Sequence, residues 1–317
     1  MVDPEIKEIA DPLLDLIRTG DCIMWAGSGL STILEYMDWK LLLRELCHRC
    51  KIVPLSNEEE NSESSVMYFI SRAEDCKKNN RDEYFRLLHT HYGEEKIINR
   101  DAYHYLMRLP FKAYLTTNFD PSLKKAGRIQ QKTDVNVFPD LNIFKINEGE
   151  SPIFYIHGLA KKIYDLKNDI LVLAESDFED AYNKGIVSSF LYYILVYKPV
   201  IFIGCRLAEP ALIESLKRTV NYQKRIYENR PFNPSKKIIL LPKLFRKDDS
   251  INKIVVPDHT RENQEEKYYR ELGIEILRYT KKDEDHSEIE EIFGYINDQI
   301  PMKPRKKLDI EYEVLKS

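Results

Sequence analysis

Seven short apolar runs alternate with longer stretches of helical spacing, and this alternation constrains the fold of the 317-residue chain more than any other feature. Short apolar runs bounded by turn residues are typical of buried strands. The runs cover residues 21–26, 111–117, 151–157, 169–174, 200–204, 237–241 and 273–279. Because strands that alternate with helices form parallel sheets covered on both faces, we expect an α/β fold with a largely parallel sheet.

The remaining segments predict how that sheet is covered. Apolar residues recur there at intervals of three and four, which indicates helices with one buried face. The predicted helices cover residues 5–18, 38–51, 65–108, 176–184, 188–197, 209–228, 261–271 and 286–298. The stretch 56–65 is rich in Glu, Asn and Ser and is typical of a loop.

The spacing of the strands predicts the domain organisation. Residues 35–108 separate the first two strands by more than one crossover helix needs, so we expect a helical insert there. No Gly/Ser-rich linker and no internal repeat divides the chain. We therefore expect one domain over residues 1–300, followed by a charged C-terminal tail over residues 301–317.

Composition narrows the class of protein. The net charge of −4 argues against a general nucleic-acid-binding surface, so no direct nucleic-acid partner is expected. The longest apolar run, 196–205, is interrupted by Lys198 and Pro199 and is too short to span a membrane. The acidic N-terminus does not resemble a signal peptide, and an odd count of five cysteines does not suggest a disulfide framework. We expect a cytoplasmic protein without a membrane partner.

Small or polar residues follow four of the predicted strands. They are Gly27-Ser28-Gly29-Leu30-Ser31, Thr116-Thr117-Asn118-Phe119-Asp120, His157-Gly158 and Gly204-Cys205-Arg206. In open α/β sheets, ligands bind beyond the carboxyl ends of the strands. If the strands are parallel, these four segments meet at one crevice, which predicts a binding site there.

Each segment also has a structural interpretation. Gly27 and Gly29 let the backbone approach an anion, with Ser31 as a helix cap or phosphate ligand, but they also suit a tight strand–helix turn. Asn118 and Asp120 can hold ribose hydroxyls or a water, or they can form an Asx turn before a helix. His157 can act as a general base or can be a core histidine bonded to the backbone.

Cys47 and Cys50 form a CxxC pair with His48 between them. A zinc site usually needs a second pair of ligands at matching spacing, and no second CxxC is present. A helix that carries two semi-buried thiols explains the pair better than a metal site.

Taken in order, the strand-end motifs resemble the sirtuin (SIR2) family. The matching motifs are Gly27-x-Gly29-x-Ser31, Thr116-x-Asn118-x-Asp120, His157-Gly158 and Phe202-Ile203-Gly204. The resemblance covers about residues 20–280. Asp38-Trp39-Lys40 and the segment 272–293 are more similar to bacterial SIR2-like domains of anti-phage defence than to protein deacetylases.

The resemblance implies a Rossmann-like domain that takes NAD as its substrate and needs no metal. By this resemblance, Gly27, Ser28, Gly29 and Ser31 would face the NAD phosphates. Asn118 and Asp120 would lie at the nicotinamide ribose. His157 would be the catalytic base, and Gly204 would border the adenosine. Three positions depart from the family pattern. Ser28 replaces the usual alanine, Arg206 stands where serine is common and can pair with the pyrophosphate, and Glu209 replaces a nearby aspartate.

The zinc ribbon of the deacetylases is another departure, because Cys205 is the one cysteine beyond His157. The resemblance therefore implies an NAD+ hydrolase that depletes NAD+ during abortive infection. Such an enzyme needs control by homo-oligomer assembly or by a partner sensor, of the ATPase, Argonaute-type or nucleotide-sensing kind. Two alternatives stay open: a module that binds NAD or ADP-ribose without turnover, and a sirtuin-type deacylase or ADP-ribosyltransferase, against which the missing zinc ribbon counts.

Overall fold

The computed structural model describes residues 3–62, 65–98, 100–166, 168–227, 235–247, 255–281 and 287–300. The predicted tail, 301–317, lies outside the described residues. Seven strands form one sheet in the order β3-β4-β2-β1-β5-β6-β9, and every neighbouring pair is parallel. The strands are β1 (Ile23–Ala26), β2 (Ala113–Thr116), β3 (Val135–Val137), β4 (Ile153–Tyr155), β5 (Val200–Ile203), β6 (Lys237–Pro242) and β9 (Glu275–Tyr279). The predicted α/β fold with a parallel sheet is confirmed.

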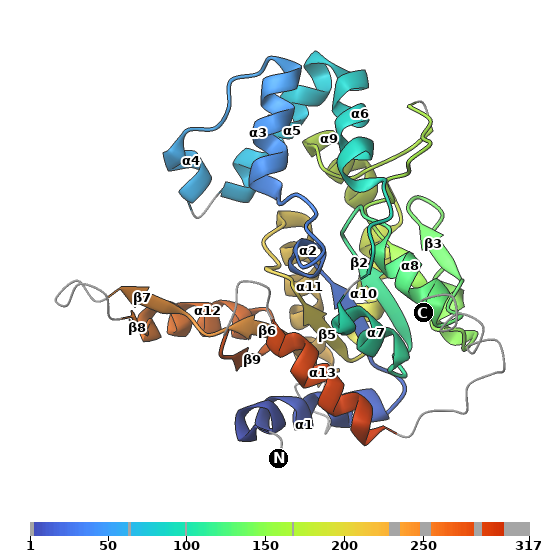
Figure 1. The fold of residues 1–317 in the computed structure, drawn as a ribbon, viewed down its shortest axis with the longest axis vertical. Coiled ribbons are helices and arrows are strands. Elements are labelled where there is room, and N and C mark those ends of the chain that lie inside the picture. The colour runs from blue at the N-terminus through green and yellow to red at the C-terminus, as the bar shows by residue number, and fades with distance from the viewer. Residues whose placement is uncertain are drawn as a thin grey trace.

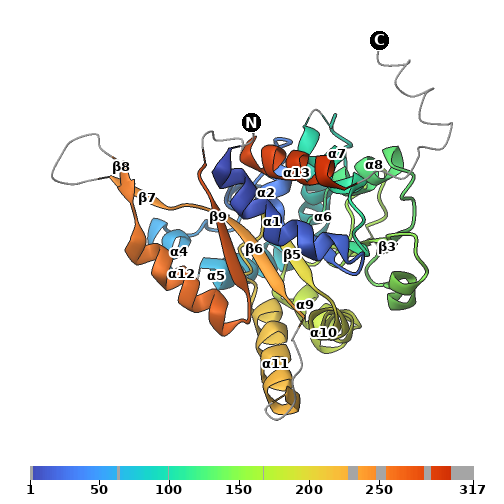
Figure 2. The same ribbon diagram turned by 90° about the horizontal axis from the view of Figure 1, so that it is seen from below.

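Two helical layers cover the sheet. They contain α1 (Pro4–Arg18), α7 (Asp101–Arg108), α8 (Ser122–Ile129), α10 (Val187–Tyr197), α11 (Pro210–Tyr227), α12 (His259–Glu271) and α13 (Ser287–Gln299). Alternate residues of each strand enter two separate cores: Met24 packs with the layer of α1, α7 and α13, and Trp25 with the layer of α10 and α11. Figure 2 shows these layers on opposite sides of the strands.

The remaining helices precede β2 or follow β4. They are α2 (Ser28–Thr32), α3 (Trp39–Cys50), α4 (Asn57–Asn61), α5 (Ser65–Asn79), α6 (Arg81–Tyr92) and α9 (Glu175–Phe178). A 3₁₀ turn, η1 (Ile143–Asn147), lies between β3 and β4, and a π-helical turn, η2 (Glu179–Asn183), follows α9. Helices α3, α5 and α6 pack on one another and gather at the end of the molecule opposite α1 and α13 (Figure 1). Within the predicted insert, α7 instead packs on α13 and belongs to a covering layer.

The structure corrects two predictions of local structure. Residues 169–174 do not form a strand; they are an extended segment in which the Val172 N–H donates to the His157 carbonyl at 2.8 Å. The predicted loop 56–65 contains α4, because Ser56 and Glu59 form a reciprocal capping box that starts a helix. The short edge strand β3 and an antiparallel pair, β7 (Phe245–Lys247) and β8 (Val255–Pro257), were not predicted.

Among the described helices, none combines the length and the apolar character that crossing a bilayer requires.

Candidate active site

The strand order brings the four strand ends together at one edge. β4, β2, β1 and β5 are consecutive parallel neighbours in the sheet. Their carboxyl ends lead into the segments that begin at Gly27, Thr117, Ile156 and Gly204. β1 lies where the chain switches from building one side of the sheet to building the other, and this position is the usual binding crevice of open α/β sheets.

Three glycines allow the turn after β1 to pack closely against the turn after β5. The Gly29 N–H donates to the Gly204 carbonyl at 2.9 Å, and a Cβ on Gly27 would lie only 2.4 Å from that oxygen. Gly204 has φ +66°, and a Cβ there would lie 2.5 Å from the backbone nitrogen of Leu30. Glycine is therefore required for close backbone packing at these positions. The predicted role of Gly27 and Gly29 at the NAD phosphates stays a prediction.

Ser28 and Ser31 differ in exposure although both lie in α2. The Ser28 side chain is exposed at the start of this five-residue helix. Ser31 is buried and donates its hydroxyl hydrogen to a carboxylate oxygen of Asp120. Ser28 is thus available to a ligand, whereas Ser31 serves the protein's own polar network.

Asn118 connects the end of β2 to the end of β1. Its side-chain nitrogen donates to the Gly27 carbonyl at 2.8 Å and to the Ser31 hydroxyl oxygen at 2.7 Å. The Thr116 hydroxyl accepts from the Asn118 backbone N–H at 3.0 Å, which fixes the turn. The side chain is half-buried, and its amide oxygen accepts none of the hydrogen bonds found among the described residues. That oxygen is the part of Asn118 available to a substrate or a water.

Asp120 is 3% exposed and serves two elements of the protein. One carboxylate oxygen accepts from Ser31, and the other accepts from the Ser122 backbone N–H at 3.0 Å, where α8 begins. The Asx-turn interpretation of Asp120 is therefore present in the structure. Its contact with a substrate ribose stays a prediction.

His157 lies just beyond β4 and has no solvent exposure. Its Nε2 lies 2.8 Å from the hydroxyl oxygen of Tyr182, while its Nδ1 is buried without a hydrogen-bond partner among the described residues. The imidazole also meets the rings of Phe178 and Tyr182 at steep angles. Burial lowers the pKa of His157 to about 3, so the ring is neutral at physiological pH.

The turn after β5 carries the two remaining predicted residues. Arg206 has an exposed side chain, and its carbonyl accepts from the Tyr269 hydroxyl at 2.7 Å. Glu209 precedes α11, and burial raises the pKa of its carboxyl against the opposing effect of backbone N–H groups. The charge of Glu209 also raises the pKa of Tyr182 and Tyr268, so these three groups lie within electrostatic reach of one another.

The predicted site residues therefore form two groups at one sheet edge. The first connects Asn118, Ser31 and Asp120 through side-chain hydrogen bonds. The second consists of His157 and Tyr182, whose Nε2 and hydroxyl oxygen lie 2.8 Å apart. Tyr182 was not predicted from the sequence. Its one sequence signal is the spacing of four from Phe178, which places both aromatic rings on one side of a helical turn.

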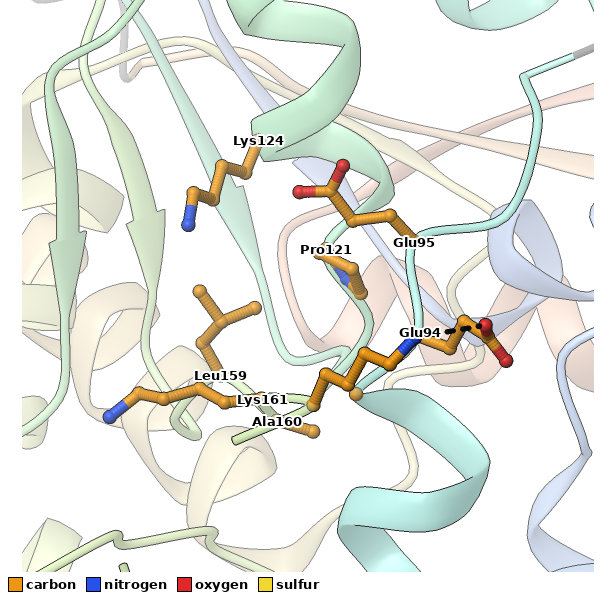
Figure 3. A pocket seen from close by; sticks show the side chains of 9 residues that line it. Glu94, Glu95, Pro121, Lys124, Leu159, Ala160 and Lys161 are labelled. Atoms are coloured by element: carbon orange, nitrogen blue, oxygen red, sulfur yellow. Dashed lines mark ion pairs between the residues drawn. The ribbon is translucent and has the colours of Figure 1, made fainter. Parts of the chain in front are cut away.

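A cavity of about 390 Å³ lies beside the ends of β2 and β4 (Figure 3). Its lining carries ionic groups of both signs and consists of Gly93, Glu94, Glu95, Pro121, Lys124, Leu159, Ala160, Lys161 and Lys162. None of the predicted site residues lines this cavity, although it adjoins the segments that follow Asp120 and His157. Figure 3 shows Lys124 and Lys161 reaching it from α8 and from the segment after β4.

The CxxC pair lies on the buried face of α3. Cys47 Sγ is 3.8 Å from Cys76 Sγ of α5, and Cys50 is buried beside them. Within the described ranges, no group of three or more His, Cys, Asp or Glu side chains has an arrangement that would hold a metal ion.

Comparison with known proteins identifies relatives of this arrangement. A family model described as "SIR2-like domain" matches residues 112–277, just over half of the chain. The matched segment contains Asn118, Asp120, His157, Gly204 and Glu209.

Three curated proteins named "NAD(+) hydrolase ThsA" are similar in sequence. The protein from Cytobacillus dafuensis is 25% identical over 65% of this chain and 39% of its own length. The proteins from Acinetobacter baumannii and Bacillus cereus are 27% and 25% identical, over 50% and 64% of this chain and 32% and 40% of their own lengths. The chain thus spans well under half the length of the curated relatives it matches.

Proposed function

This chain belongs to the SIR2-like domain family, and from that premise we propose that it hydrolyses NAD+ to nicotinamide and ADP-ribose. The observation that carries the proposal is the buried, unpartnered Nδ1 of His157 at the sheet edge where Asn118 also lies. An unpaired polar atom in a dry site is costly and points to a ligand that completes it. The three relatives named as NAD(+) hydrolases support the choice of substrate.

The chemistry suits the groups present. The nicotinamide ring of NAD+ carries a positive charge and leaves as a neutral molecule, so no general acid is needed. The transition state at C1′ resembles an oxocarbenium ion, as in other glycosyl cleavage. We assign to Asn118 the placement of the ribose and the attacking water, and to His157 the acceptance of the proton that the water releases. The products are nicotinamide, ADP-ribose and one proton, which passes from the imidazolium to solvent.

A weakly basic imidazole is adequate for this step. Water that attacks a cationic carbon becomes strongly acidic as the bond forms, so a base of low pKa can still accept its proton. Burial keeps His157 neutral, and therefore able to accept a proton, across the physiological range. A positioned base of this kind contributes about 10²–10⁴-fold to the rate.

The proposed biological role follows from the harm that NAD+ hydrolysis would do to the host cell. Unrestrained NAD+ hydrolysis harms its host, so we assign to this chain a conditional role: depletion of cytoplasmic NAD+ in anti-phage abortive infection. Control comes from homo-oligomer assembly or from a partner sensor protein. The catalytic unit in this proposal is residues 1–300, with α3, α5 and α6 of the insert above the sheet.

Incubation of the purified protein with NAD+, followed by chromatography of nicotinamide and ADP-ribose, tests the proposal. We expect equal amounts of both products, and loss of both in His157→Ala and Asn118→Ala. The assay is repeated with the product of the neighbouring gene, which supplies the expected trigger. NAD+ turnover that persists in His157→Ala would remove this mechanism.

One observation favours a second candidate, a module that binds NAD or ADP-ribose without turnover. His157 has no solvent exposure. The side-chain nitrogen of Asn118, the Ser31 hydroxyl and the Asp120 carboxylate all make hydrogen bonds to other groups of the protein. Such a module would bind NAD+ in an equilibrium measurement and would release no nicotinamide, with or without the partner.

A further inference from the structure

We infer that Tyr182 is a positioning residue that fixes the tautomer of His157, so that Nε2 carries the hydrogen and Nδ1 faces the reacting water as the proton acceptor. This inference rests on the proposed function, because it assigns the atom of His157 that acts in NAD+ hydrolysis.

The hydrogen bond of His157 starts the argument. A neutral imidazole has one N–H donor and one acceptor nitrogen, and the partner of one nitrogen decides the state of the other. Nε2 lies 2.8 Å from the Tyr182 hydroxyl oxygen, and Nδ1 has no partner in the described structure. If Nε2–H donates to Tyr182, the Nδ1 lone pair is free to take a proton. If Tyr182 donates instead, Nδ1 carries the hydrogen and cannot act as a base.

The burial of Nδ1 favours the first arrangement. If Tyr182 donated to Nε2, the hydrogen of the neutral ring would sit on Nδ1, which is buried and has no acceptor among the described residues. A buried N–H without an acceptor is rarer in proteins than an acceptor with an unused lone pair. We therefore place the hydrogen on Nε2, where the Tyr182 oxygen accepts it.

The backbone holds Tyr182 in place for this contact. Tyr182 lies in the π-helical turn η2, and such turns are rare and occur frequently at functional sites. The Ser188 hydroxyl donates to the Tyr182 carbonyl at 2.7 Å, which anchors the turn to α10. The Phe178 ring packs against both Tyr182 and His157. The hydroxyl therefore meets Nε2 from a fixed position, as a positioning residue requires.

Nuclear magnetic resonance of the 317-residue chain, labelled with ¹⁵N-histidine, tests the inference without relying on activity. The His157 signal is assigned by its loss in His157→Gln. We expect Nε2 to be protonated and Nδ1 unprotonated in the wild-type protein, and Tyr182→Phe to mix or reverse the two states. A wild-type His157 protonated at Nδ1, or a tautomer unchanged by Tyr182→Phe, would overturn the inference whether or not the protein hydrolyses NAD+.

Kinetics give a second, separate readout. Tyr182→Phe keeps the ring that packs on His157 and Phe178 but removes the hydroxyl, so we expect kcat to fall by about 10²-fold with little change in KM. Tyr182→Leu removes ring and hydroxyl; if only packing mattered, Phe would preserve kcat and Leu would not. Tyr114→Phe is the control for the loss of a buried hydroxyl away from this edge; that hydroxyl accepts from Lys132 and donates toward the Leu106 and Leu109 carbonyls. If Tyr182→Phe has the kcat of the wild-type protein and activity still requires His157, the positioning role of Tyr182 is rejected, whereas the proposed NAD+ hydrolase function is not.

Discussion

The side-chain nitrogen of Asn118 lies 2.8 Å from the carbonyl oxygen of Gly27, so the residue that follows one strand holds the end of its neighbour. The same nitrogen donates to Ser31 at 2.7 Å, and both of its hydrogens are therefore used inside the protein. Asn118 thus has a structural role through its side-chain amide nitrogen and a proposed catalytic role through its side-chain amide oxygen. A substitution that separates these two roles is informative.

Asn118→Asp retains the size and an oxygen but replaces both donors with an acceptor. Its carboxylate would face the Gly27 carbonyl and lie close to Asp120, which is already bonded to Ser31. We expect a loss of about 1–3 kcal/mol in the free energy of unfolding, because two buried acceptors lose their donor. Urea denaturation measures the loss, and the NAD+ assay measures the accompanying fall in turnover.

Asn142→Asp is the matched control for that substitution. Asn142 accepts from the Phe144 N–H through its side-chain oxygen, and Asp keeps this bond. It should change neither stability nor turnover. An Asn118→Asp variant as stable as this control would contradict the connection between β1 and β2 described above.

Gly204→Ala tests the packing of the two glycine turns. A Cβ at this position, where φ is +66°, would lie 2.5 Å from the Leu30 nitrogen and 2.9 Å from the Gly29 carbonyl carbon. Backbone strain and overpacking together should destabilise the fold by about 3 kcal/mol or more. Thermal denaturation with calorimetry gives the change.

Gly149→Ala isolates the strain from the clash. Gly149 has φ +88°, and a Cβ added there would meet no atom within 4 Å, so the substitution should cost only about 1 kcal/mol. Equal losses at Gly204 and Gly149 would show that the close approach of the two turns does not matter for stability.

The ion pair between the partly buried Lys77 and the buried Asp177 attaches the insert to the segment that leads to Tyr182. Lys77 of α5 donates to Asp177 and to the Ser176 hydroxyl at 2.9 Å, and both partners lie in α9. Lys77→Met leaves the buried carboxylate of Asp177 without its cation and should cost about 3 kcal/mol at pH 7. Denaturation monitored by circular dichroism measures this value.

The deficit of Lys77→Met should depend on pH. Burial raises the pKa of Asp177, and the loss of Lys77 raises it further, so the folded variant binds a proton more readily than the unfolded chain. Its stability therefore falls as pH rises through that range, and the deficit is smaller at pH 4 than at pH 7. Lys184→Met, which breaks an exposed pair with Asp180, should cost less than about 0.5 kcal/mol. A deficit at Lys77 no larger than this would exclude a buried ion pair.

The buried histidine predicts a second pH dependence. The pKa of His157 is lowered from 6.5 to about 3 by burial, so between these values the unfolded chain binds the extra proton. Stability should therefore fall as pH drops below about 6.5, by up to about 1.4 kcal/mol per pH unit from this one site. His157→Gln should reduce that slope. Part of the slope that remains comes from His89, because burial lowers the pKa of His89 as well. An unchanged slope in His157→Gln would contradict a buried neutral imidazole.

The parallel sheet could be predicted from the sequence because each central strand is a short apolar run between turn residues. Val200–Ile203 and Ile23–Ala26 are wholly buried, so every position had to be apolar. The run 169–174 has a similar composition but forms no strand: its Val172 N–H donates to the His157 carbonyl, residues 171–174 are buried in the cores, and Ile170 is exposed. Composition could not distinguish these two cases.

The site was predictable in its location but not in its contacts. Small and polar residues after four strands indicated the sheet edge, because those residue types are rare inside a core. The engagement of Asp120 by Ser31 and the packing of Gly27 on Gly204 depend on neighbours that are 89 and 177 positions apart in the chain. Tyr182 could not be found because a buried tyrosine in a helical turn resembles ordinary core.

Release of labelled nicotinamide in a single turnover tests the central claim most directly. Wild-type protein in excess over NAD+ that carries a labelled nicotinamide ring, with the partner present, is quenched at intervals and compared with His157→Asn. NAD+ binding to both proteins is measured in parallel. We predict that both bind NAD+ and that His157→Asn releases nicotinamide at least about 10²-fold more slowly. Equal release rates would contradict the proposal, because His157 would then play no part in breaking the bond.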